Sequence, residues 1–76
     1  MSLFYALLVT HIDFTVNIID EDMFIEIPSN FNDYFNILKD ETLPLGGVIG
    51  ISEKGIVIHF ANADYIINQF HKALSL

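Results

Sequence analysis

Alternation of apolar and polar residues predicts two strands in the first half of the chain. Residues 11–19 place an apolar side chain at every second position, and these are Ile12, Phe14, Val16 and Ile18. This period is typical of a half-buried strand. A second alternating run, residues 23–27, follows an acidic cluster, so the two runs are predicted to form a hairpin. Pro28 has no backbone N–H for a sheet and therefore ends the second strand.

A helical period follows each predicted hairpin. In the first half, apolar residues recur at i, i+3, i+4 and i+7, and they are Phe31, Tyr34, Phe35 and Leu38. Residues 48–52 and 56–60 flank a short connection that ends in Gly55, which predicts a second hairpin. The last helix has an apolar stripe of Ala63, Ile66, Ile67, Phe70 and Leu74. Asn62 is its predicted N-cap, and Asp64 lies in the first turn, where a negative charge suits the helix dipole.

The two halves of the chain share this order of elements. Asn30 aligns with Asn62 in the helices, and Ile25 aligns with Ile56 in the strands. We therefore predict a single domain over residues 1–76, with half-repeats at approximately 11–42 and 46–76. The predicted fold class is α+β: a pseudo-repeated ββα-ββα chain with a four-stranded, mainly antiparallel sheet and two helices on one face.

Apolar residues at the N-terminus and in the second hairpin go beyond this simple layout. Residues 3–9 are all apolar and continue without Gly or Pro, which predicts a long N-terminal strand over 3–19, bent or bulged near Thr10 and His11. The second hairpin is apolar on both sides, with Ile49, Ile51 and Val57 assigned to one of them. Helices on one face of the sheet would leave an apolar patch on the other, so we expect a homodimer and take Ile49, Ile51 and Val57 as its candidate surface.

The composition supports a small domain with a dense core or a core shared with a second subunit. A chain of 76 residues buries only about 60% of its unfolded surface, and a hydrophobic content of 53% compensates for this. The absence of cysteine excludes disulfides and thiolate zinc sites. The first residues lack the basic region of a signal peptide, and no run approaches the roughly 18 apolar residues of a membrane span. We therefore expect a cytoplasmic protein with no membrane partner.

Charge points towards a protein partner. Ten acidic residues against three basic ones give a net charge of −7, which would repel a phosphate backbone and disfavours direct nucleic-acid binding. The same charge favours encounter with a basic protein, although a solvated acidic surface would also explain it. An aromatic residue beside Asn and Asp is common at interfaces. The candidate partner surface comprises Asp20, Glu21, Asp22, Asp64, Tyr65 and Asn68.

Catalytic and metal-binding chemistry has little support in the sequence. His11 and Asp13 are two apart on a predicted strand, and with His59 they could form a small-ligand or metal site, or an enzyme's acid–base pair. However, the usual spacing of three or four ligands is missing. Adjacent acids in a tight turn point in different directions and do not form a calcium loop. We predict no catalytic residue, no cofactor and no metal.

These observations favour a non-enzymatic protein-binding module that inhibits or regulates a larger, basic, nucleic-acid-handling protein. Phage-encoded anti-defence proteins and toxin immunity proteins are similar to this chain in size and charge, although no motif identifies a family. The site at His11, Asp13 and His59 is one alternative. A structural subunit of a larger assembly is another.

Overall fold

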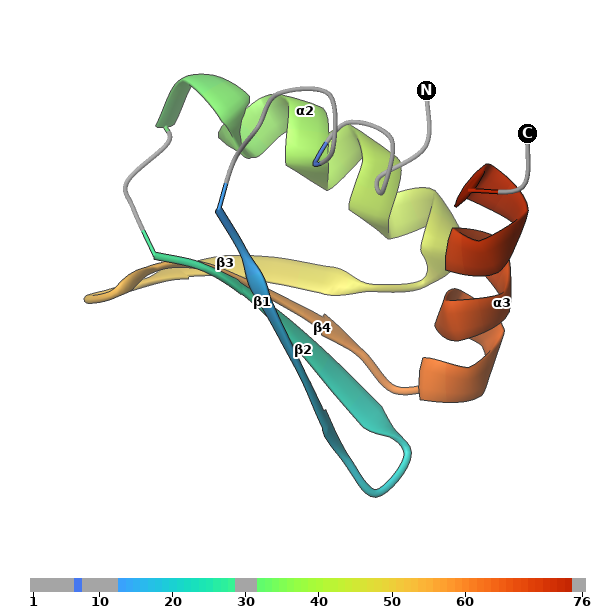
Figure 1. Cartoon of the computed structure of the whole chain (residues 1–76). Coiled ribbons are helices and arrows are strands. Elements are labelled where there is room, and N and C mark those ends of the chain that lie inside the picture. Colours follow the sequence, from blue (N-terminus) through green and yellow to red (C-terminus); the bar gives the residue numbers. More distant parts are fainter. Residues whose placement is uncertain (1–6, 8–12, 29–31, 75–76) are drawn as a thin grey trace.

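The computed structural model, which describes residues 7, 13–28 and 32–74, contains a four-stranded sheet and two α-helices (Figure 1). In chain order, the elements are β1 (Thr15–Ile19), β2 (Asp22–Ile27), α2 (Asn32–Thr42), the 3₁₀ turn η1 (Leu43–Leu45), β3 (Val48–Ser52), β4 (Gly55–Phe60) and α3 (Ala63–Leu74). The predicted α+β class is therefore confirmed. Among the described residues, no helix has the length and hydrophobicity needed to cross a membrane.

The strands form one antiparallel sheet in the order β1-β2-β4-β3. Its two central strands bury alternate residues: Met23, Ile25 and Ile27 in β2, and Ile56, Ile58 and Phe60 in β4. These positions match the alternation in the sequence because a central strand has neighbours on both edges and a core on one side. Figure 1 shows α2 along one side of the sheet and α3 beside the end of β4. The predicted four-stranded antiparallel sheet is confirmed.

Both hairpins close over two residues, and local chemistry explains each turn. Ile19 pairs with Asp22, and Asp20 between them has a φ of 57°. Aspartate tolerates this left-handed conformation better than most residues. In the second hairpin, Ser52 Oγ accepts a hydrogen bond from the Lys54 N–H at 3.2 Å, and Gly55 has a φ of 136°. The acidic and glycine-containing connections therefore act as turns, as the sequence predicts.

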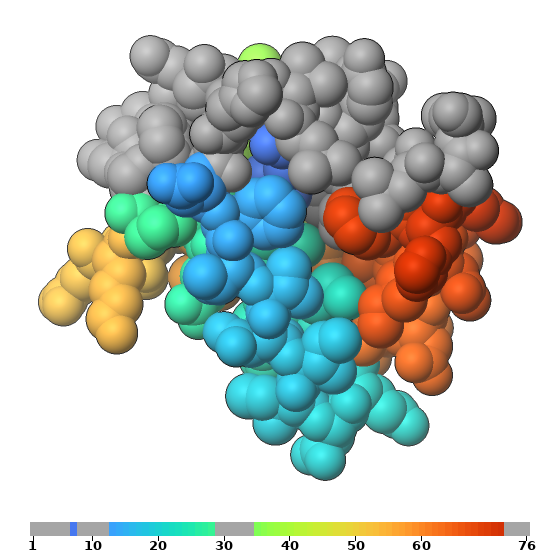
Figure 2. Space-filling model, in the orientation of Figure 1, coloured from blue at the N-terminus to red at the C-terminus, as the bar shows by residue number. Residues whose placement is uncertain are grey.

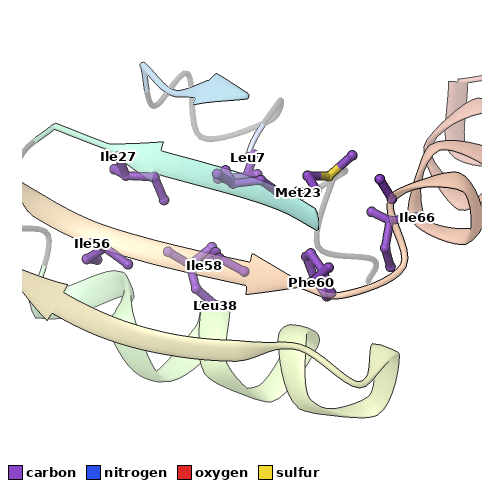
Figure 3. Close-up of a cluster of buried hydrophobic side chains, with 10 residues drawn as sticks. Leu7, Met23, Ile27, Leu38, Ile56, Ile58, Phe60 and Ile66 are labelled. Carbon is purple, nitrogen blue, oxygen red and sulfur yellow. The ribbon is translucent and has the colours of Figure 1, made fainter. Parts of the chain in front are cut away.

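Buried side chains from the sheet and from both helices form one core cluster. Its buried side chains are Leu7, Met23, Ile25, Ile27, Leu38, Ile56, Ile58, Phe60, Ala63 and Ile66. Figure 3 shows Leu38 of α2 beside Ile58 of β4. Helix α2 ends at Thr42, whose buried hydroxyl donates a 2.6 Å hydrogen bond to the Leu38 carbonyl. Gly46 then adopts a φ of 81°, so the chain turns sharply into β3.

The prediction of one long N-terminal strand is wrong. Leu7 has a helical backbone and is only 1% exposed, while β1 begins at Thr15. A continuous apolar run fits a buried helix as well as a buried strand, because it has no polar positions that reveal a period. The predicted bend at Thr10 and His11 lies outside the described residues.

The predicted grouping of Ile49, Ile51 and Val57 on one side of the sheet is also wrong. Ile49 pairs with Ile58 and Ile51 with Ile56, so both share the side of the core. Val57 lies on the opposite side, which we call the outer side of the sheet. The strand residues of the outer side are Thr15, Asn17, Ile19, Asp22, Phe24, Glu26, Val48, Gly50, Ser52, Gly55, Val57 and His59. The two strands of this hairpin are apolar on both sides, and a one-residue change of register exchanges those sides.

Strand lengths in the two halves are equal. Strands β1 and β3 each have five residues, and β2 and β4 each have six. With the hairpins aligned, Ile25 corresponds to Ile58 rather than to the predicted Ile56. Ile25 and Ile58 are also direct neighbours across the central pair of strands.

Candidate functional site

The turn between β1 and β2 is attached to the beginning of α3. The Ala63 N–H donates a hydrogen bond to the Glu21 carbonyl oxygen at 2.9 Å. Next to it, Asn62 Oδ1 accepts the Tyr65 N–H at 3.3 Å, so Asn62 caps the helix as predicted. The bond between Ala63 and Glu21 brings together segments that are far apart in the sequence, while the Asn62 cap is local to the start of α3.

Three acidic residues lie at this junction: Asp20, Glu21 and Asp64. We call them the acidic corner. They line a hollow together with Ala61, Asn62 and Ala63. All three acidic side chains are exposed. The partial positive charge at the start of a helix offsets some of their mutual repulsion. The hollow contains no basic residue, so the corner presents negative charge to solvent.

Tyr65 and Asn68 extend the acidic corner along α3. Tyr65 is 47% exposed, and Asn68 is also exposed. Residues three or four apart are neighbours on a helix surface, so Asn68 lies next to both Asp64 and Tyr65. In Figure 2, the cyan turn forms the lower tip of the molecule and the orange start of α3 lies to its right. Five of the six predicted partner residues therefore border one region of the surface.

Asp22, the sixth, interacts with His59 on the outer side of the sheet. His59 Nε2 lies 3.1 Å from Asp22 Oδ1, and an ionised carboxylate accepts this hydrogen bond from the ring N–H. The His59 ring also stacks on Phe24, with a centroid distance of 4.7 Å and an interplanar angle of 11°. Sequence reasoning missed this cluster because the pairing of β2 with β4 brings its members together.

The alternative site at His11, Asp13 and His59 gains no support. His11 lies outside the described residues, and Asp13 precedes Thr15 at the end of the sheet where Ile27 pairs with Ile56. His59 lies towards the other end of the sheet. In the part of the chain that the structure describes, no group of three His, Cys, Asp or Glu side chains could hold a metal ion.

Comparisons with protein-family models, curated proteins and solved structures find no match for this chain. The acidic corner is thus interpreted from its own geometry and charge.

The Asn62 cap at the start of α3 can be tested directly. Asn62→Ala removes the acceptor for the Tyr65 N–H and is expected to destabilise the chain by about 1 kcal/mol. Urea unfolding followed by circular dichroism measures this change. Asn68→Ala is the matched control, because Asn68 lies within the same helix and is exposed. Alanine is a better helix former there, so its effect should be neutral or slightly stabilising. Equal destabilisation by both variants would contradict the capping role.

Proposed function

We propose that this chain is a small acidic, non-enzymatic protein-binding module that inhibits or regulates a larger, basic protein. The observation that carries the proposal is the convergence of the acidic turn and the exposed start of α3 at one corner. A nucleic-acid-handling enzyme is the class of partner that fits best, because such enzymes present basic surfaces to phosphate. An anti-defence or immunity-type inhibitor of that kind would occupy the surface that nucleic acid uses.

Charge and exposed aromatic surface have separate roles in this proposal. The net charge of −7 would accelerate encounter with a basic surface, because complementary potentials steer association. Tyr65 would supply contact area with little loss of side-chain entropy, and Asn68 would supply hydrogen bonds. The acidic corner thus combines long-range attraction with a candidate anchor.

The proposal also includes a cytoplasmic homodimer formed through the sheet. Ile19 and Val48 are 62% and 65% exposed on the outer side, where Val57 is half-buried. Covering such surface is favourable, and a second copy of the same chain is its commonest partner. A very large native mass in light scattering would instead support a structural subunit of an assembly.

Two features of the fold belong to the same proposal. We place both helices on one face of the sheet, which is supported by the shared burial of Leu38 and Ile66 in one cluster. We also treat the two ββα halves as a pseudo-repeat, supported by equal strand lengths and two-residue turns in both hairpins.

Neutralising the acidic corner should weaken partner binding. The variant Asp20→Asn with Glu21→Gln removes two charges, and asparagine tolerates the positive φ of Asp20. Affinity capture from the native lysate, followed by titration of the recovered protein, should show at least about a tenfold loss of affinity, since each desolvated charge contact contributes about 1 kcal/mol or more.

The matched control is Asp40→Asn with Glu53→Gln. It removes the same charge from exposed residues outside the corner, and it should change affinity by less than about threefold, as expected for distant surface charges at moderate salt. Equal losses would show that only net charge matters. Retention of the partner by the corner variant would contradict the proposed function.

A further inference from the structure

Strand β1 is an edge strand without the usual protection against pairing. In the described part of the chain it pairs only with β2, and all five of its residues are exposed. Its sequence, TVNII, contains no charge, no proline and no glycine. Natural edge strands usually carry lysine, proline or a bulge, because their free N–H and C=O groups can recruit another strand. This edge therefore has backbone groups available for a partner.

The opposite edge of the sheet is less suited to such pairing. Strand β3 has the same length, but Gly50 lies at its centre and provides no side chain for a neighbour to pack on. Helix α2 also packs against β3. The two edges thus differ, because of the pair only β3 has a central glycine and a contact with α2.

Apolar side chains of β1 are exposed on both sides of the sheet. On the side of the core, Val16 is 44% exposed and Ile18 is 49% exposed, although their cross-strand neighbours Ile25 and Met23 are buried. On the outer side, Ile19 is 62% exposed. The apolar side of the sheet thus extends from the buried residues of β2 to β1, where its side chains are exposed to solvent. One more strand with alternating apolar residues would cover Val16 and Ile18.

Charge distinguishes the possible occupants of this edge. Acidic residues flank β1 at both ends, with Asp13 before it and Asp20 and Glu21 after it. Antiparallel pairing of two β1 strands would bring the acidic flank of one copy beside that of the other, and like charges repel. A segment with basic residues would instead be attracted, most strongly at the end beside the acidic corner.

We propose that β1 accepts an extended segment of the partner protein as a fifth strand of the sheet. The segment has apolar residues at alternate positions and Lys or Arg residues at the end beside the acidic corner. Main-chain hydrogen bonds then provide affinity, while the apolar and basic positions provide specificity. This inference rests on the proposed function, and it identifies how the partner would be held.

Two synthetic peptides can test the chemistry of this segment. Both alternate valine and threonine over six residues; one ends in two lysines and the other in two glutamates. Titration into isotope-labelled protein should shift the amide signals of β1 and slow the hydrogen exchange of those β1 amides that do not donate to β2. The lysine peptide should bind at least about tenfold more tightly than the glutamate peptide at low salt, and added salt should reduce that ratio. Absence of binding by the lysine peptide, or shifts confined to β3, would overturn the inference.

Substitutions provide the matched comparison. Ile18→Lys and Val16→Lys place a charge on the β1 edge at exposed positions and should weaken binding of the lysine peptide at least about tenfold. Ile51→Lys makes the same change on β3, where the side chain is 60% exposed, and should alter affinity less than about twofold. Circular dichroism checks that all variants fold. Equal effects of Ile18→Lys and Ile51→Lys would overturn the β1 assignment.

Two further outcomes separate this inference from the proposed function. If Ile18→Lys abolishes a dimer seen by sedimentation, a second copy occupies β1 and the inference is wrong. If the captured partner is retained by Ile18→Lys but lost when the acidic corner is neutralised, the proposed function holds and the β1 inference fails. Loss of the partner from Ile18→Lys but not from Ile51→Lys supports both.

Discussion

Gly47→Ala should destabilise the chain by about 1–3 kcal/mol, although it adds only one methyl group. A Cβ atom at this position would overlap Phe60 Cε1 and would lie 2.7 Å from both Phe60 Cδ1 and Thr42 Cγ2. Both neighbours are buried, at 1% and 0% exposure. The Gly47 N–H also donates to the Thr42 carbonyl at 3.2 Å, which limits how far the backbone can move. Urea unfolding would measure the loss.

The same substitution at Gly50 is the control. A Cβ atom there would have no neighbour within 4 Å, so Gly50→Ala should change stability by less than about 0.5 kcal/mol or raise it slightly. In a Phe60→Leu background, Gly47→Ala should lower the stability less than it does in the unsubstituted chain, because leucine lacks the ring atoms that the methyl group would contact. Equal effects at Gly47 and Gly50 would show that close packing against Phe60 is not the constraint.

The glycine pair illustrates how far the sequence can predict structure. Proline cannot continue a helix and glycine tolerates a positive φ, so Pro44 and the two glycines are residue types that mark a sharp turn, and Gly46 has a φ of 81°. The role of Gly47 is different, since it depends on contact with Phe60, which lies on another strand. Tertiary contacts of this kind have no signal in local sequence.

The alternation in the sequence predicted the buried positions of β2, but residues 11–19 do not form the expected half-buried strand, because β1 begins at Thr15 and all five of its residues are exposed. Met23, Ile25 and Ile27 alternate with polar or half-buried positions in β2, so their burial could be predicted. Residues 48–52 and 56–60 contain apolar residues on both sides, and their register could not be determined from sequence. The strand prediction for the continuous apolar run that includes Leu7 was wrong because this run also lacks polar positions that would reveal its period.

Parts of the candidate site were predictable, but their arrangement was not. Asn62 and Asp64 have the residue types that begin a helix, and the acidic turn is evident between two strands. Their proximity depends on the hydrogen bond between Ala63 and Glu21, which only the folded chain contains. The pairing of His59 with Asp22 likewise requires β4 to lie beside β2.

Ile58→Ala should destabilise the chain by about 2–5 kcal/mol, more than the added methyl group at Gly47. Ile58 is fully buried on the central strand β4, beside the equally buried Ile25 of β2 and near Leu38 of α2 (Figure 3). Truncation would remove apolar contacts and leave a cavity that a close-packed core fills only in part. At roughly 0.05–0.15 kcal/mol per residue, a chain of this length has a total stability of about 4–11 kcal/mol. The variant would therefore lose a large share of its stability.

Two comparisons make the Ile58 prediction specific to its position in the sheet. Ile51→Ala, at a 60% exposed position in the neighbouring strand, should cost less than about 1 kcal/mol, because most of the removed surface is already in water. Ile25→Ala should lower the stability by the same amount as Ile58→Ala if the two hairpins are equivalent, since these residues correspond when the hairpins are aligned. Because they are in contact, the double variant should deviate from additivity by about 0.5 kcal/mol or more, within the range known for neighbouring residues. Urea unfolding of the four variants and of the unsubstituted chain would measure these losses. A loss of stability in Ile58→Ala no greater than in Ile51→Ala would contradict a core centred on β2 and β4.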